Sequence, residues 1–263
     1  MIYQPATISN VLGNLPQLPD WITSGRAKTP ENVAFRSGAA LTVLDQLVSD
    51  PTHGVPVKLL ANRLALKAAT AISTLEGRMA READIRDAYH LTPPGEARGP
   101  DGDLLAFWRD SVRLRLIGRG HQAGLHDLVG PAFGDDVAEW MEAAVERSTT
   151  HGPLTGCVSV MRAVLEVDDR AERIACLLSD VILARALNSK TVLPITAAHL
   201  TKALLRNLVA EGQGGELVVL QRILVSIEET IRLARNLASK AAALCEIAPK
   251  LRAKGSDAAV ALF

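Results

Sequence analysis

Apolar residues recur along most of this chain at intervals of three and four positions, the spacing of one face of an α-helix. No stretch shows the sustained alternation of apolar and polar residues that a half-buried β-strand requires. The pattern therefore predicts an all-α helical bundle. It contains nine helices, at about residues 33–49, 56–77, 82–91, 101–118, 135–148, 154–166, 169–188, 196–210 and 216–248.

The last predicted helix, 216–248, has the clearest periodicity. It contains no glycine or proline, and its apolar positions follow alternating steps of four and three, which is a heptad pattern. The stripe begins with large residues and ends with small ones: Leu220, Leu224, Ile227, Ile231, Ala234, Ala238, Ala241, Cys245 and Ala248. Such a stripe is typical either of the spine of an intramolecular bundle or of a seam between two copies of a chain.

Two parts of the chain resemble each other at an offset of about 110 positions. Arg-Leu-Ala at 63–65 corresponds to Arg-Ile-Ala at 173–175, and His-Leu-Thr at 90–92 recurs at 199–201. Duplicated helical units usually pack as similar halves around a shared core. We therefore expect two related halves interlocked in one domain, with the boundaries 1–29 for an N-terminal arm, 30–130 for the first half and 131–263 for the second.

The N-terminal arm, residues 1–29, is rich in proline, glycine, asparagine and serine, which predicts an extended segment. Its apolar residues either fix the arm to the body or form a docking peptide for another chain. The first helix should begin at Thr29-Pro30-Glu31, because threonine is a good cap, proline fits the first turn and an acid favours the positive helix end.

Composition narrows the function classes. The chain has 263 residues, of which 48% are hydrophobic and only 3% aromatic, which suits closely packed helices. The 29 basic residues balance the 29 acidic ones, so the protein has no overall attraction for polyanions. No uncharged apolar run approaches the ~20 residues of a membrane span, and the N-terminus lacks a secretory signal. We expect a cytoplasmic protein with no membrane association.

The cysteines indicate neither a disulfide framework nor a zinc knuckle, because they are odd in number and widely spaced. Cys157, Cys176 and Cys245 each lie among apolar residues. This context predicts three small buried hydrophobic side chains. No cofactor is expected.

Two segments share the pattern Asp-Asp-x-x-Glu, formed by Asp135, Asp136 and Glu139 and by Asp168, Asp169 and Glu172. Carboxylates four positions apart share a helix face and are suitable ligands for Mg²⁺, as in helical isoprenoid synthases. The helix dipole also favours acids at helix N-termini without any metal. Nine aromatic residues are few for the cavity of such an enzyme. A Mg²⁺-dependent enzyme is therefore a remote alternative.

His90 and His199 occupy equivalent positions in the internal repeat. Related halves would bring them together across a pseudo-twofold axis, as a split metal or acid–base site requires. Neither histidine has a second metal ligand at helical spacing. A structural histidine bonded to a nearby backbone carbonyl is the competing interpretation.

Four arginines, Arg109, Arg113, Arg115 and Arg119, form a basic run that is expected to lie on one helix, on two of its faces. Such runs contact phosphate groups or acidic partners, or they form a solvated face balanced by neighbouring acids. The chain has no nucleophile elbow, P-loop or dinucleotide fingerprint.

Several stretches together resemble a known bacterial family. They are Arg63–Ala69, Leu75–Arg78, Ile85–Ala88, the turn Leu91–Gly95, Gly99-Pro100, Trp108-Arg109 and Leu193–Leu200. The family is domain of unknown function 1403, and the resemblance covers most of residues 30–250. It is associated with alphaproteobacteria and often with plasmids. The resemblance implies a stand-alone cytoplasmic helical protein and transfers no catalytic residue, because the family has no assigned activity.

The leading hypothesis from the sequence is a non-catalytic helical interaction module, with a homodimer as one form of it. Its expected seam lies on helix 216–248 and consists of Leu220, Leu224, Ile227, Ile231, Ala234 and Ala238. The alternative is a nucleic-acid-associated accessory protein of a plasmid or mobile element, which the basic run would serve.

Overall fold

The computed structural model describes residues 15–25, 27–116, 121–134, 136–211 and 213–252. Within these ranges it contains eleven α-helices, two short 3₁₀-helices and no strand, which confirms the expected all-α class. None of these helices combines the length and the apolar character of a membrane span. The helices are α2 (Asp20–Thr23), α3 (Pro30–Ser49), η1 (Pro51–His53), α4 (Val57–Leu75), α5 (Glu82–His90), α6 (Gly99–Val112), α7 (His121–Val129), α8 (Asp136–His151), α9 (Pro153–Val167), α10 (Glu172–Ala186), η2 (Thr196–His199), α11 (Lys202–Ala210) and α12 (Gln213–Arg252).

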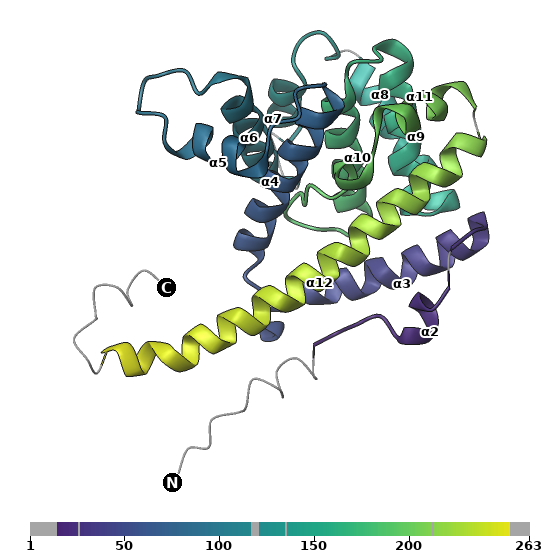
Figure 1. The fold of residues 1–263 in the computed structure, drawn as a ribbon. Helices are drawn as coiled ribbons and strands as arrows, with labels where there is room; N and C mark the ends of the chain where they lie inside the picture. The colour runs from purple at the N-terminus through teal and green to yellow at the C-terminus, as the bar shows by residue number, and fades with distance from the viewer. Residues whose placement is uncertain (1–14, 26, 117–120, 135, 212, 253–263) are drawn as a thin grey trace.

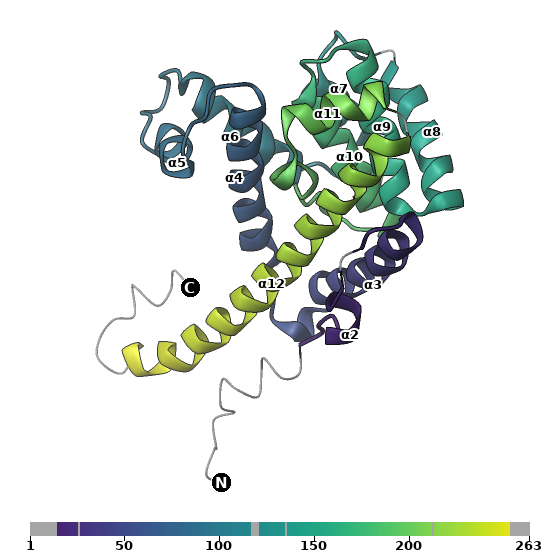
Figure 2. The same cartoon turned by 45° about the vertical axis from the view of Figure 1, so that its right-hand side comes forward.

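The long helix α12 crosses the whole molecule, and α3 lies along it (Figure 1). An ion pair links the two helices, with Arg36 Nη2 donating to Glu228 Oε2 at 2.9 Å. In Figure 2, α4, α5 and α6 form a group of helices at the left, and α8 to α11 form a second group at the right. Because α12 also contacts α4, α9, η2 and α11, it connects the two groups of helices.

The apolar stripe of α12 is covered by the chain's own helices along most of its length. None of the six residues of the expected seam is more than 7% exposed: Leu220, Leu224, Ile227, Ile231, Ala234 and Ala238. The stripe is the spine of an intramolecular bundle in this structure. These six residues therefore offer no exposed surface to a second copy.

The structure does not show the internal duplication. Helix α5 has nine residues, whereas the corresponding part of the second half contains only the four-residue turn η2. Helix α6 packs along α4, but α12, the counterpart of α6, packs mainly along α3. The duplication therefore stays a prediction from the sequence.

Several predicted boundaries need correction. The helix expected at 196–210 is divided into η2 and α11, because Thr201 is extended and its Oγ1 accepts a hydrogen bond from Leu204 N. The helix expected at 101–118 ends at Val112, and α7 was not predicted at all. The arm is not wholly extended, since α2 forms one turn within it.

The start of α3 and the attachment of the arm agree with the sequence. Thr29 Oγ1 accepts a hydrogen bond from Asn32 N at 3.3 Å, as expected of a helix cap. Leu15 is only 5% exposed, and the carbonyl oxygen of Ala27 accepts a hydrogen bond from Gln221 Nε2 at 2.7 Å. The described part of the arm therefore packs against the body of its own chain.

Helices α8 and α9 lie close together at Gly156. A Cβ atom on Gly156 would lie 2.5 Å from the carbonyl oxygen of Ala144 and 2.7 Å from Ser148 Cβ. Neither atom is the far end of a flexible side chain. A Cβ atom on Gly38, in the exposed middle of α3, would meet nothing within 4 Å. The two glycines therefore form a matched pair for substitution.

We expect Gly156→Ala to lower the free energy of unfolding by about 1–3 kcal/mol, because the extra methyl group forces α8 and α9 apart. Gly38→Ala should raise the free energy of unfolding by about 0.5–1 kcal/mol, because alanine is the better helix former. Denaturant unfolding followed by circular dichroism measures both effects. Equal effects of the two substitutions would contradict the close approach of α8 and α9.

Candidate functional site

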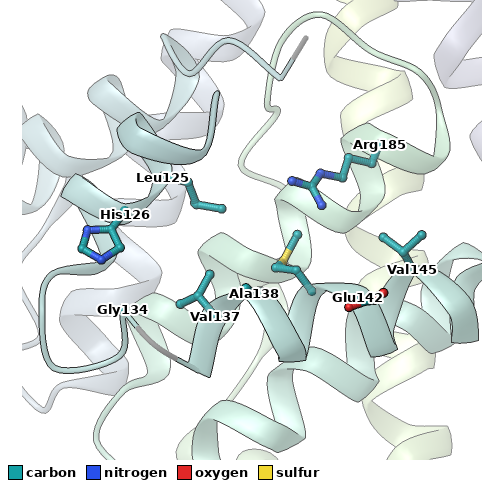
Figure 3. A pocket seen from close by; sticks show the side chains of 9 residues that line it. Leu125, His126, Gly134, Val137, Ala138, Glu142, Val145 and Arg185 are labelled. Carbon is teal, nitrogen blue, oxygen red and sulfur yellow. The ribbon is translucent and has the colours of Figure 1, made fainter. Parts of the chain in front are cut away.

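A cavity of about 660 Å³ lies between α7, α8 and α10 (Figure 3). Its apolar wall includes three side chains that are at most 8% exposed, namely Leu125 from α7 and Val137 and Met141 from α8. Val145, which is partly exposed, extends this wall along α8. The volume and the apolar lining are typical of sites for small molecules.

Helical periodicity of α8 explains how the wall forms. Val137, Met141 and Val145 follow one another at intervals of four, so they lie on one side of the helix. At the other edge of the cavity, His126 packs against Gly134, where a Cβ atom would collide with the imidazole Nε2. A larger residue at position 134 would therefore displace the His126 ring.

Two charged residues border this apolar space. Arg185 comes from the last turn of α10 and directs its guanidinium toward the cavity (Figure 3). Burial lowers the pKa of this half-buried arginine. Glu142 lies on α8 beside Met141 and is exposed. No ion pair joins Arg185 to Glu142 or to another residue in the described ranges.

The two acidic motifs have separate local roles. Asp136 and Glu139 are exposed on the first turn of α8, while Asp135 lies outside the described residues. In the second motif, Asp168 Oδ1 accepts a hydrogen bond from Arg170 N at 2.9 Å. Asp169 is exposed.

Glu172, the last acid of the second motif, is 1% exposed and lies 3.0 Å from Lys202 Nζ, an ion pair between α10 and α11. Across the described ranges, no three His, Cys, Asp or Glu side chains are grouped closely enough to hold a metal ion. The acids of the motifs that the structure describes therefore form no carboxylate cluster.

The two histidines of the proposed repeat have different surroundings. His199 Nε2 lies 3.0 Å from Glu229 Oε2, and Lys67 Nζ lies 3.4 Å from the same oxygen. Partial burial acts to raise the pKa of Glu229, but His199 and Lys67 outweigh it and the pKa is lowered. His90 is exposed at the end of α5, and its ring lies edge-on to the Tyr89 ring with 5.0 Å between the ring centroids.

The basic run does not lie on one helix, which corrects the expectation. Helix α6 ends at Val112, so only Arg109 belongs to it, and its guanidinium stacks 4.7 Å over the Tyr89 ring. Arg113 pairs with Asp110 at 2.8 Å, and Arg115 is exposed. Arg119 lies outside the described residues.

The whole-chain comparison decides the family. A family model described as "Protein of unknown function (DUF1403)" matches residues 6–263. The chain belongs to this family. The match confirms the resemblance carried by the sequence stretches above and extends it to almost the full length. No curated protein and no solved structure matches the chain. The function of DUF1403 proteins is not known, so the function of this chain is argued from its geometry.

Sequence reasoning missed one buried acid of this DUF1403 member. Asp180 on α10 is 1% exposed, and its Oδ1 accepts hydrogen bonds from Ile195 N and Thr196 N, both at 2.9 Å. Its Oδ2 has no partner, and burial raises the pKa of Asp180 to about 7. The signal in the sequence was a single acid inside the apolar run from Cys176 to Ala184.

Two of the three cysteines agree with expectation and one does not. Cys157 and Cys176 are buried, and burial raises both thiol pKa values. Cys245 is exposed on α12, which corrects the prediction of three buried thiols. The apolar positions around Cys245 belong to a part of α12 that the rest of the described chain does not cover.

We expect Asp180→Asn to change how stability depends on pH. The folded protein binds the Asp180 proton more tightly than the unfolded chain, so this group stabilises the fold below about pH 4 and loses that effect as the pH rises to about 7. Asparagine keeps the acceptor oxygen but does not ionise. Relative to wild type, the variant should gain up to about 4 kcal/mol between pH 4 and 8.

Urea unfolding of both proteins across that pH range measures the difference between their free energies of unfolding. Titrations of other groups, which the two proteins share, cancel in this difference. A difference that stays constant with pH would show that Asp180 has an ordinary pKa in the folded protein.

Proposed function

We propose that this DUF1403 protein is a helical interaction module that binds a second copy of itself through the free end of α12, defined here as residues 239–248. The observation that carries the proposal is the change in exposure along this helix. Leu237 and Ala238 are 6% and 2% exposed, whereas Leu244 and Ile247 are 48% and 46% exposed. In both views this end of α12 extends away from the other helices (Figure 1, Figure 2).

The free end continues the apolar pattern of the buried part of the helix. Ala241, Leu244 and Ala248 follow Leu237 at steps of four, three and four, so they share one face. A helix segment that is exposed to water on all sides does not require an apolar face. Burial of a leucine or isoleucine side chain contributes about 1.5–3 kcal/mol, and a symmetric pair of helices buries each of them twice.

The spacing of large and small residues supports a second copy of the chain as the partner. In an antiparallel pair centred between residues 241 and 244, Leu244 of each copy lies opposite Ala241 of the other. Each leucine then packs against a small residue, which allows close interdigitation. A parallel pair in register would place leucine against leucine. We therefore favour an antiparallel twofold arrangement.

This location differs from the seam expected from the sequence. The residues from Leu220 to Ala238 form the intramolecular spine, and the proposed contact begins where that spine ends. The exposed thiol of Cys245 borders the same face.

We expect Leu244→Asp to convert a dimer into a monomer, because a carboxylate cannot be buried in an apolar contact without a partner. Ile247→Asp should act in the same direction. The matched control is Val209→Asp on α11, since Val209 is also exposed, at 37%, but lies on another helix.

Size-exclusion chromatography with light scattering across the micromolar range measures the mass of each protein. The proposal predicts a dimeric wild type and a dimeric Val209→Asp variant, with an unchanged helix signal in all variants. A monomeric wild type at every concentration would overturn it, as would a Leu244→Asp variant that is still dimeric.

A further inference from the structure

We infer that the cavity between α7, α8 and α10 binds an apolar monocarboxylic acid, and that Arg185 binds its carboxylate. The inference concerns a different part of the molecule from the free end of α12 and does not depend on self-association. It combines three observations: an apolar wall, a half-buried arginine without a partner, and a carboxylate at the rim.

Arg185 differs from Arg36 and Arg173, two other partly buried arginines of this fold, which have carboxylate partners. Arg36 pairs with Glu228 and Arg173 with Glu76, at 2.9 and 2.7 Å. Arg185, by contrast, has no hydrogen bond or ion pair with any described residue. A charge that is removed from water without compensation destabilises a protein, so the site favours an added anion.

The guanidinium selects the kind of anion. Its planar N–H groups match a carboxylate and form two parallel hydrogen bonds with it. Arginine stays protonated even though burial lowers its pKa, so the positive charge is permanent at physiological pH.

Glu142 limits the charge of the ligand. It lies on the same side of the cavity as Arg185 (Figure 3) and is exposed. A phosphate monoester carries a charge near −2 at neutral pH, so it meets one arginine and one repelling carboxylate. A carboxylate with a single charge is the better match for this pair.

The walls determine the rest of the ligand. Leu125, Val137 and Met141 present hydrocarbon and thioether surface, and an apolar group gains about 25 cal/mol for each Å² that it buries there. An aliphatic or aromatic acid of modest size thus places its hydrocarbon part against α7 and α8 while its carboxylate reaches Arg185 on α10.

Isothermal titration calorimetry with octanoate, 1-octanol and octyl phosphate tests this inference. Wild type should bind octanoate most tightly, because only octanoate offers both the hydrocarbon chain and a singly charged head. Arg185→Gln should weaken the binding of octanoate about tenfold to a hundredfold, the range expected for lost charge-assisted hydrogen bonds. The affinity for 1-octanol should stay unchanged. Arg185→Lys should retain part of the affinity for octanoate. Arg170→Gln is the control, since Arg170 is an exposed arginine in the turn before α10.

A second readout separates binding from folding. Without ligand, the thermal midpoint of Arg185→Gln should equal or exceed that of wild type, because an unpaired charge has been removed. Octanoate should raise the midpoint of wild type and not that of the variant. Ala138→Phe narrows the cavity at an exposed position and should abolish binding of octanoate and 1-octanol together.

Equal affinity of wild type and Arg185→Gln for octanoate would overturn the inference, as would tighter binding of octyl phosphate than of octanoate. Absence of octanoate binding to the folded wild type would also overturn it. Each of these results can be obtained whether the protein is a monomer or a dimer, so they are separate from the test of self-association.

Discussion

Burial of one apolar stripe of α12 is the interaction on which the rest of the structure depends. The stripe packs against α3 along much of its length and also meets α4, α9, η2 and α11, which belong to both groups of helices. Ile227 and Ala234 are fully buried at its centre. The Arg36–Glu228 ion pair adds direction to this contact, because it fixes the position of α3 along α12. A single helix thus holds two bundles together.

Apolar stripes of this kind are the part of the fold that the sequence predicts best. Long segments such as α4, α9 and α12 are predicted from the sequence because their apolar residues recur at helical spacing. The cap at Thr29 is foreseen because it depends on neighbouring residues only. Helix α7 is missed since it has nine residues and includes Gly124, so its own sequence gives little helical signal.

The candidate site is less predictable for a different physical reason. Val137 and Met141 have the spacing of one helix face, but the space beside them exists only because α7 and α10 approach α8. Arg185 looks like an ordinary helix-ending arginine, and its lack of a partner is a property of the folded molecule. Asp180 looks like a defect in an apolar helix, whereas it holds the backbone of Ile195 and Thr196.

The molecule consists of a covered body that contains a cavity and a helix that extends beyond it. Family membership places this arrangement in DUF1403 and supplies no activity of its own. In the body, α10 carries both Asp180, which accepts hydrogen bonds from a neighbouring loop, and Arg185, which borders the cavity. On α12, the apolar pattern continues beyond the part of the helix that the other helices cover. We propose that both features are surfaces for binding, one for a small ligand and one for a second copy of the chain.

Hydrogen exchange along α12, measured by mass spectrometry at several protein concentrations, distinguishes the buried spine from the free end. We expect slow exchange from about residue 219 to residue 238 at every concentration, because this segment is the spine. We expect fast exchange at 239–248 in dilute solution and slower exchange as the concentration rises. Uniform exchange along the whole helix, independent of concentration, would contradict both the spine and the free end.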